Sequence, residues 1–136
     1  MKKKGILVSS LLTFIMMFVL AVPVFAETSS KSFKLKGNDF AHCCKRELKV
    51  DSNGSVTVSL NDVTGAKYWT IKVIVYNVLT DKEFVAEFDE NDRSSSKTFR
   101  NLKAGDYNIR IENHSLNKLS GSLGFSWTGK WGSVIE

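Results

Sequence analysis

Apolar and polar positions alternate along most of the chain from residue 33 onward. Alternation with a period of two places one set of side chains on each face of a β-strand. The longest such segment, 68–79, is apolar on both faces at its middle, which predicts a strand central in its sheet. The alternating segments predict strands at 33–36, 47–50, 56–60, 68–79, 84–88, 97–102, 107–112, 122–127 and 131–135.

Short polar segments separate these strands and predict turns between them. The pair Asn53-Gly54 tolerates the positive φ angles of a tight turn, so 47–50 and 56–60 are predicted to form a β-hairpin. No segment shows helical periodicity over three turns. The fold class is therefore predicted as all-β, a single antiparallel β-sandwich of about eight strands. We expect its core to contain Trp69, Ile71, Val73, Phe88, Tyr107, Ile109, Ile111 and Phe125.

The first 26 residues have a different pattern from the rest. A basic start, Met1-Lys2-Lys3-Lys4, is followed by the apolar run Leu11–Val22 and by small residues in Val24-Phe25-Ala26. This order is typical of a secretory signal peptide, so 1–26 is predicted to be cleaved after Ala26. The mature chain, 27–136, is predicted to be one secreted β-sandwich domain with a frayed leader at 27–32. The alternative is that 1–26 stays on the chain as an uncleaved membrane anchor. After this segment, no second apolar run is long enough to span a membrane.

The net charge of +5 comes mostly from this N-terminal segment. Three lysines and no acidic residue fall within 1–26, which leaves 16 basic and 14 acidic residues in the remainder. A dedicated nucleic-acid binder needs a clustered basic stripe, which this balance argues against. No nucleotide-binding loop or nucleophile elbow is present in the sequence, so we expect a non-enzyme.

Cys43 and Cys44 are adjacent and are the only cysteines of the chain. Export implies oxidising surroundings, in which an exposed pair of thiols tends to oxidise. Three arrangements remain open: a vicinal disulfide that stiffens a turn, a disulfide between chains, and a reduced pair with one thiol buried. The two residues are therefore a candidate redox pair, and in no intramolecular case do they close a long loop.

Two groups of residues are candidate metal ligands. His42-Cys43-Cys44 contains zinc-binding residue types, but contiguous residues cannot easily converge on one ion and only His114 remains as a fourth ligand. Asp89, Asn91 and Asp92 form an oxygen-rich loop of the kind that calcium binds, without the EF-hand pattern. A solvated acidic loop is the simpler interpretation, so no cofactor is expected, with calcium at this loop as the alternative.

Trp127 and Trp131 flank a Thr-Gly-Lys segment near the C-terminus. Exposed aromatic rings can stack on sugars, so the pair is a candidate ligand platform. The alternative is that Trp127 continues the apolar face of 123–127 into the core, because tryptophan is largely buried in most proteins.

The segment 102–111, Leu-Lys-Ala-Gly-Asp-Tyr-Asn-Ile-Arg-Ile, has the pattern L-x-A-G-x-Y-x-I-x-I. It resembles the strand entry of secreted bacterial β-sandwich domains of the pre-peptidase C-terminal type, and the resemblance covers 99–127. It implies a non-catalytic extracellular sandwich in which a glycine turn delivers an aromatic residue into the core. The vicinal cysteines are no part of that pattern, and no functional residues can be transferred.

Together these observations predict a small secreted, non-catalytic β-sandwich. We expect it to be a binding or accessory module for a surface polysaccharide or a protein, without a nucleic-acid partner and without stable membrane insertion after signal cleavage. The alternative function is a secreted antimicrobial or toxin-like effector. An amphipathic, cation-rich element, which membrane-active proteins commonly have, is not evident in the sequence.

Overall fold

The computed structural model describes residues 26–92 and 95–135 of the chain. The predicted signal peptide therefore lies, except for Ala26, outside the described residues, and its cleavage stays a prediction. Within the described part no helix is long and apolar enough to cross a membrane. The described residues form the strands β1 (Ala26–Leu35), β2 (Phe40–His42), β3 (Arg46–Val50), β4 (Gly54–Thr64), β5 (Thr70–Asn77), β6 (Glu83–Asp89), β7 (Ser96–Leu102), β8 (Gly105–Asn113) and β9 (Leu119–Val134).

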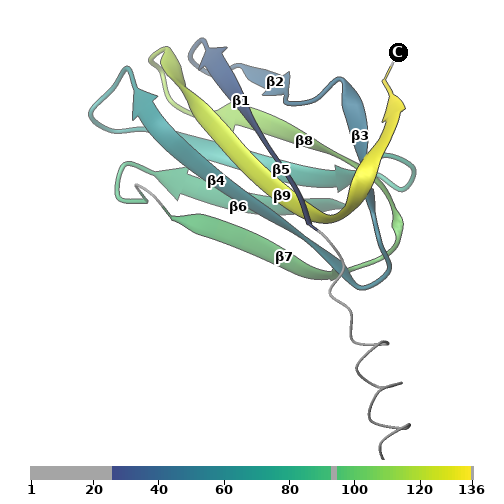
Figure 1. Cartoon of the computed structure of the whole chain (residues 1–136). Coiled ribbons are helices and arrows are strands. Elements are labelled where there is room, and N and C mark those ends of the chain that lie inside the picture. Colours follow the sequence, from purple (N-terminus) through teal and green to yellow (C-terminus); the bar gives the residue numbers. More distant parts are fainter. Residues whose placement is uncertain (1–25, 93–94, 136) are drawn as a thin grey trace, which may run out of the picture.

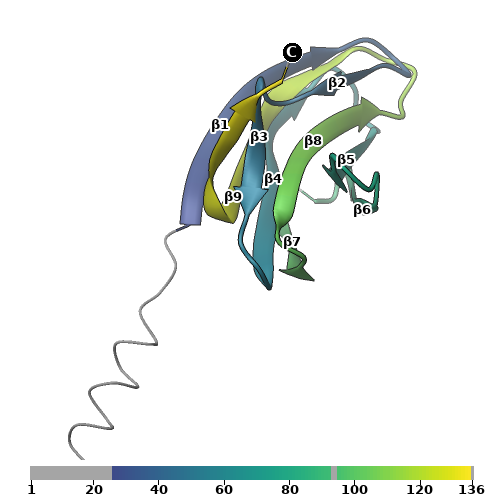
Figure 2. The same cartoon turned by 90° about the vertical axis from the view of Figure 1, so that its right-hand side faces the viewer.

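These strands form two antiparallel layers that face each other across one core (Figures 1 and 2). The first layer, sheet A, has the order β1-β9-β4-β7. The second layer, sheet B, has the order β6-β5-β8, with β2 and β3 one after the other along the far edge of β8. The prediction of an all-β antiparallel sandwich is confirmed.

The long strand β9 joins the two layers. Its first part pairs with β1 and β4 in sheet A, and its last part, from Gly129 onward, pairs with β3 in sheet B. Gly129 has a φ of +150°, and a Cβ atom there would collide with the backbone carbonyl of Lys49. Only glycine allows the backbones to approach so closely where the strand changes sheets.

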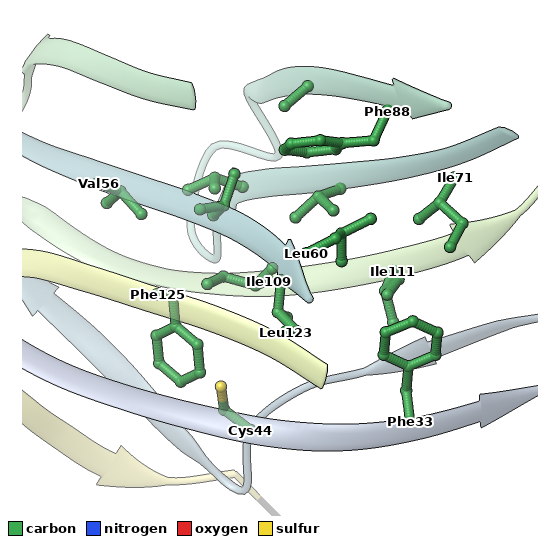
Figure 3. Close-up of a cluster of buried hydrophobic side chains, with 14 of the residues drawn as sticks. Phe33, Cys44, Val56, Leu60, Ile71, Phe88, Ile109, Ile111, Leu123 and Phe125 are labelled. Atoms are coloured by element: carbon green, nitrogen blue, oxygen red, sulfur yellow. The ribbon is translucent and has the colours of Figure 1, made fainter. Parts of the chain in front are cut away.

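The eight residues predicted for the core are all buried. Each of them is at most 5% exposed, and Ile71, Val73, Phe88 and Ile109 are fully buried. Figure 3 shows Phe88, Ile71 and Ile109 from sheet B together with Val56, Leu60 and Leu123 from sheet A. The alternation of the sequence therefore identified the inward face of the central strands correctly.

The predicted hairpin at Asn53-Gly54 is wrong in its pairing. The turn itself forms, because Asn53 has a φ of +56° and the Gly54 amide donates to the carbonyl oxygen of Asp51 at 2.9 Å. However, β3 and β4 do not pair, since β9 lies between them and pairs with both. A local turn preference reverses the chain but does not determine which strand becomes the neighbour.

The segment 27–32, predicted as a frayed leader, is instead part of β1. Its residues pair one by one with β9, from Glu27 opposite Trp127 to Ser32 opposite Ser122. These side chains are mostly exposed, so the strand is held by its backbone and leaves no apolar alternation to detect. The short strand β2 was also missed, and the two strands predicted at 122–127 and 131–135 are one continuous strand.

Candidate binding surface

The outward side of sheet B carries a regular array of aromatic, aliphatic and charged side chains. Residues directly opposite on neighbouring strands form rows across β6, β5, β8 and β2. The central row is Val85, Ile74, Arg110 and His42, and the rows on either side are Glu87, Lys72, Glu112 and Phe40, and Glu83, Tyr76 and Asn108. We call this array of eleven residues the sheet B face.

Arg110 lies at the centre of the sheet B face and holds two carboxylates. Its Nη2 donates to Oε1 of Glu83 and its Nε donates to Oε2 of Glu112, each at 2.9 Å. The guanidinium also lies over the ring of Tyr76, 5.7 Å from the ring centroid. Because the side chain of Arg110 is only 23% exposed, these contacts fix its planar group in one orientation.

Aromatic side chains adjoin this charged cluster. The His42 ring meets the Tyr76 ring edge-on at a centroid distance of 5.9 Å, and Phe40 meets His42 in the same way at 6.2 Å. Phe40 is 58% exposed and Val85 is 50% exposed, so the apolar part of the face is open to solvent. Ile74 and Asn108 are buried although they point outward, because their neighbours cover them.

Several protonation equilibria are shifted on this face. Burial raises the pKa of Tyr76, against the opposing effect of Arg110. Partial burial would lower the pKa of Arg110, but its hydrogen bonds to Glu83 and Glu112 outweigh that effect and the pKa is raised. Burial would likewise raise the pKa of Glu112, but hydrogen bonds from His114 and Arg110 lower it. The network thus stabilises the charged forms of Arg110 and Glu112.

Cys43 and Cys44 form a vicinal disulfide directly after β2. This is one of the three arrangements that the sequence left open. Leu48 follows His42 by six positions, whereas their partners on β8, Tyr107 and Arg110, are three positions apart. The chain between His42 and Leu48 therefore has three residues more than the facing part of β8 and forms a bulge between β2 and β3. The disulfide lies within this bulge. Cys44 is buried beside Phe125 (Figure 3), and Cys43 is half-buried and donates its amide to the carbonyl of Ile109.

The tryptophan pair does not form an exposed platform. Trp127 is 1% exposed and its indole Nε1 donates to the carbonyl of Lys130 at 3.0 Å. Trp131 is half-buried and packs edge-on against Trp127, with their centroids 4.6 Å apart. Trp127 therefore belongs to the core, as the alternative interpretation of the sequence expected, because it continues the inward face of β9. Only Trp131 retains exposed surface.

The structure places the candidate metal ligands, and calcium binding at Asp89, Asn91 and Asp92 stays a prediction. Among the described residues no group of three or more His, Cys, Asp or Glu side chains is placed to hold an ion. Asp89 and Asp92 accept hydrogen bonds from the backbone amides of Asn91 and Asp89 within their own loop. His114 is hydrogen-bonded to Glu112 at 2.8 Å, and the two cysteines are bonded to each other.

The outward side of sheet A differs from the sheet B face. Its rows consist mainly of small hydroxyl-bearing residues, such as Thr28, Ser126, Thr57 and Thr98 across the four strands. The hydroxyls of Thr57 and Thr98 bond to each other at 2.8 Å. This side offers neither an aromatic anchor nor a charged network, so the sheet B face is the candidate site.

The sheet B face could not be recognised from the sequence alone. One signal was present in the sequence: β5 has apolar residues on both faces, and Ile74 and Tyr76 lie on its outward side. Without the register of β2 and β8, however, nothing indicated that Arg110, His42 and Phe40 lie beside them.

Comparisons with known proteins bear on the fold. No protein-family model and no curated protein matches the chain. Among solved structures, the chain is similar to the periplasmic g-type lysozyme inhibitor PliG of Aeromonas hydrophila, with a TM-score of 0.51, 17% identity and coverage of 78% of this chain and 90% of that one. It is also similar to the Yersinia pseudotuberculosis-derived mitogen, with a TM-score of 0.48, 10% identity and coverage of 78% and 88%. At such identities the likeness shows the fold alone.

The resemblance of 99–127 to pre-peptidase C-terminal-type domains stays a prediction. The local geometry expected from the motif is present, since Gly105 begins β8 and Tyr107 is buried. The Tyr107 hydroxyl donates to the carbonyl oxygen of Lys103 at 2.8 Å, so the ring is anchored at the turn that precedes its strand. Many sandwiches have such a tyrosine corner, so it indicates architecture and not ancestry.

Proposed function

We propose that this chain is an exported, non-catalytic module that binds a protein partner through the sheet B face. The observation that carries the proposal is the cluster of Arg110, Tyr76, His42 and the exposed Phe40. Arginine and tyrosine are enriched among the residues that dominate binding energy at protein interfaces. A guanidinium already held in place by two carboxylates also loses little conformational entropy when a partner binds.

The composition of the face favours a protein over a polysaccharide. Stacking on sugars needs an exposed aromatic platform, and the tryptophan pair does not supply one. The sheet B face instead combines apolar side chains at Phe40 and Val85 with polar groups around Arg110. An apolar contact region bordered by hydrogen-bonding groups is typical of protein interfaces.

The fold comparison selects the first partner to test. The Aeromonas neighbour is described as an inhibitor of a g-type lysozyme, and the fold match spans most of both chains. This supports a module that binds a lysozyme as one form of the proposed function. Purified g-type lysozyme is therefore a suitable first probe, with c-type lysozyme and insoluble peptidoglycan beside it.

The test compares Arg110→Ala and Phe40→Ala with the wild type, using biolayer interferometry on 27–136. If the face is the interface, each substitution should raise the Kd for a bound lysozyme by at least about 30-fold, the effect of an interface residue worth about 2 kcal/mol. Arg100→Ala is the matched control, because Arg100 is an exposed arginine on β7 of sheet A. Urea melts verify that the variants are folded.

Binding of a lysozyme with unchanged affinity in both variants would refute the role of the face. Binding of peptidoglycan but of neither enzyme would favour a polymer-binding module instead. The effector alternative makes a different prediction, leakage of dye from lipid vesicles or killing of bacterial cells by the purified domain. The proposed function predicts no leakage.

A further inference from the structure

A recess lies between the two sheets on the side where β1 and β2 are not paired with each other. It has a volume of about 180 Å³ and opens between β1 of sheet A and β2 of sheet B. Its lining includes Phe33, Ala41, Cys43 and Leu123, with Lys31 and Lys34 from β1. Pockets for drug-sized ligands measure about 300–1,000 Å³, so this recess has room for a single side chain and not for a complete small molecule.

The recess is bordered by two strand edges. In the described part of the chain β1 pairs only with β9, and β2 pairs only with β8, which leaves one edge of each strand without a strand partner. An unpaired edge presents alternating N–H and C=O groups that can pair with a further strand. An extended segment of another protein can therefore add to β1 by backbone hydrogen bonds and place one side chain in the recess.

The charge of the border restricts which segment can bind. Lys31 and Lys34 both line the recess and both are exposed, and no carboxylate belongs to its lining. Lysines on an edge strand normally prevent pairing with neutral or basic strands. A strand with acidic residues opposite these lysines would instead gain favourable cross-strand pairs.

We propose that the edge of β1 binds an extended acidic segment of a protein partner by β-strand addition. Phe33 faces the core and Lys34 faces outward, because their positions alternate along β1. The bound segment therefore has an apolar residue opposite Phe33, an acidic residue opposite Lys34 and another acidic residue opposite Lys31. Read along β1 from Lys31 to Lys34, this gives the pattern acidic–any–apolar–acidic, so a parallel strand carries it in this order and an antiparallel strand carries it in reverse. His42 borders both the recess and the sheet B face, but the binding proposed along β1 does not depend on the function proposed for that face.

The experiment uses two capped synthetic peptides as probes, Thr-Glu-Thr-Leu-Glu-Thr and its reverse, titrated into 27–136 and followed by NMR. The peptide with the matching direction should bind, shift the resonances of β1 and Ala41, and slow amide exchange along β1. Lys34→Glu should weaken this binding by at least about tenfold, and a peptide with lysine in place of glutamate should restore it. Lys103→Glu, an exposed lysine in the turn before β8, is the control and should change nothing.

Two further tests address the backbone pairing and the recess. N-methylation of the leucine of the peptide, and separately of the residue after it, removes donors on alternate sides of the strand, so one of them should abolish binding. Ala41→Leu fills the recess and should also abolish it, while Arg110→Ala should leave it unchanged. Failure of both peptides to bind, or binding that survives Lys34→Glu and both N-methylations, would overturn the proposal. Either result leaves the sheet B face proposal untouched, because that proposal is tested with other variants and other probes.

Discussion

Replacement of both cysteines, Cys43→Ala with Cys44→Ala, should leave the domain folded and only slightly less stable. The disulfide joins adjacent residues, so it encloses no loop whose entropy it could reduce in the unfolded state. The main loss is the buried sulfur of Cys44, which is 7% exposed. Transfer of a group of that size from water to the interior contributes about 0.8 kcal/mol to the free energy of unfolding. The small void that remains after its removal adds to the loss. We therefore expect a loss of about 1–2 kcal/mol, against the roughly 2–4 kcal/mol of an ordinary disulfide.

The assay is a urea melt of wild type and double variant, each with and without a dithiol reductant. Hydrogen exchange on the same samples should show faster exchange at the Cys43 amide, which bonds to the Ile109 carbonyl next to the ring. Exchange within the β5–β8 pairing should not change. A loss above about 3 kcal/mol would mean that the bridge holds the fold together. Unfolding of the wild type by reductant alone would have the same meaning, and either result would refute the reasoning.

Four further changes test the core and the polar network. Ile109→Ala should cost about 2–5 kcal/mol in a urea melt, since Ile109 is fully buried and a cavity would remain; a loss below 1 kcal/mol would contradict the register. Asn113→Ala should cost about 2–4 kcal/mol by the same measurement, because the buried side chain loses its bonds to the carbonyls of Leu35, Lys36 and Asn117 and the Ser115 amide loses its acceptor; exposed Asn61→Ala is its control. Tyr107→Phe removes the bond to Lys103 and should cost about 1 kcal/mol in a thermal melt. Glu112 has a folded-state pKa below its ordinary value of 4.5, so its carboxylate stabilises the fold above pH 4.5 and this effect is lost as the pH falls through the folded-state pKa. Glu112→Gln should therefore flatten the acid side of the curve of stability against pH. The partial exposure of the side chain keeps this effect small.

Hydrophobic alternation was sufficient to predict the inward faces of the strands. Tyr107, Ile109 and Ile111 recur at every second position, and this periodicity reflects burial on one side of β8. The fold class followed from the same signal, because short alternating segments separated by turns favour a sandwich. Burial on one face of a strand is a local property, so it leaves a local trace in the sequence.

Strand pairing left no comparable trace. The turn at Asn53-Gly54 was recognised from its residue types, but the strands beside β4 are β7 and β9, which lie far along the chain. The strand β1 was missed over 27–32 because a polar edge strand is held by backbone hydrogen bonds, which any residue except proline can form. The sheet B face required this long-range register, since its rows combine residues of strands that are distant in sequence.

The three residues of β2 connect the two proposed surfaces. Phe40 and His42 belong to the sheet B face, while Ala41 lines the recess beside β1 and His42 also borders it. The disulfide follows directly and lies in the bulge that lets β2 and β3 share one edge of β8. A change confined to Arg110 should therefore affect only the outer face, and a change at Lys34 only the recess. Opening the disulfide frees the end of β2, which carries residues of the sheet B face and of the recess. Reduction should therefore weaken binding at both surfaces, while the core, held by β5, β8 and β9, stays intact.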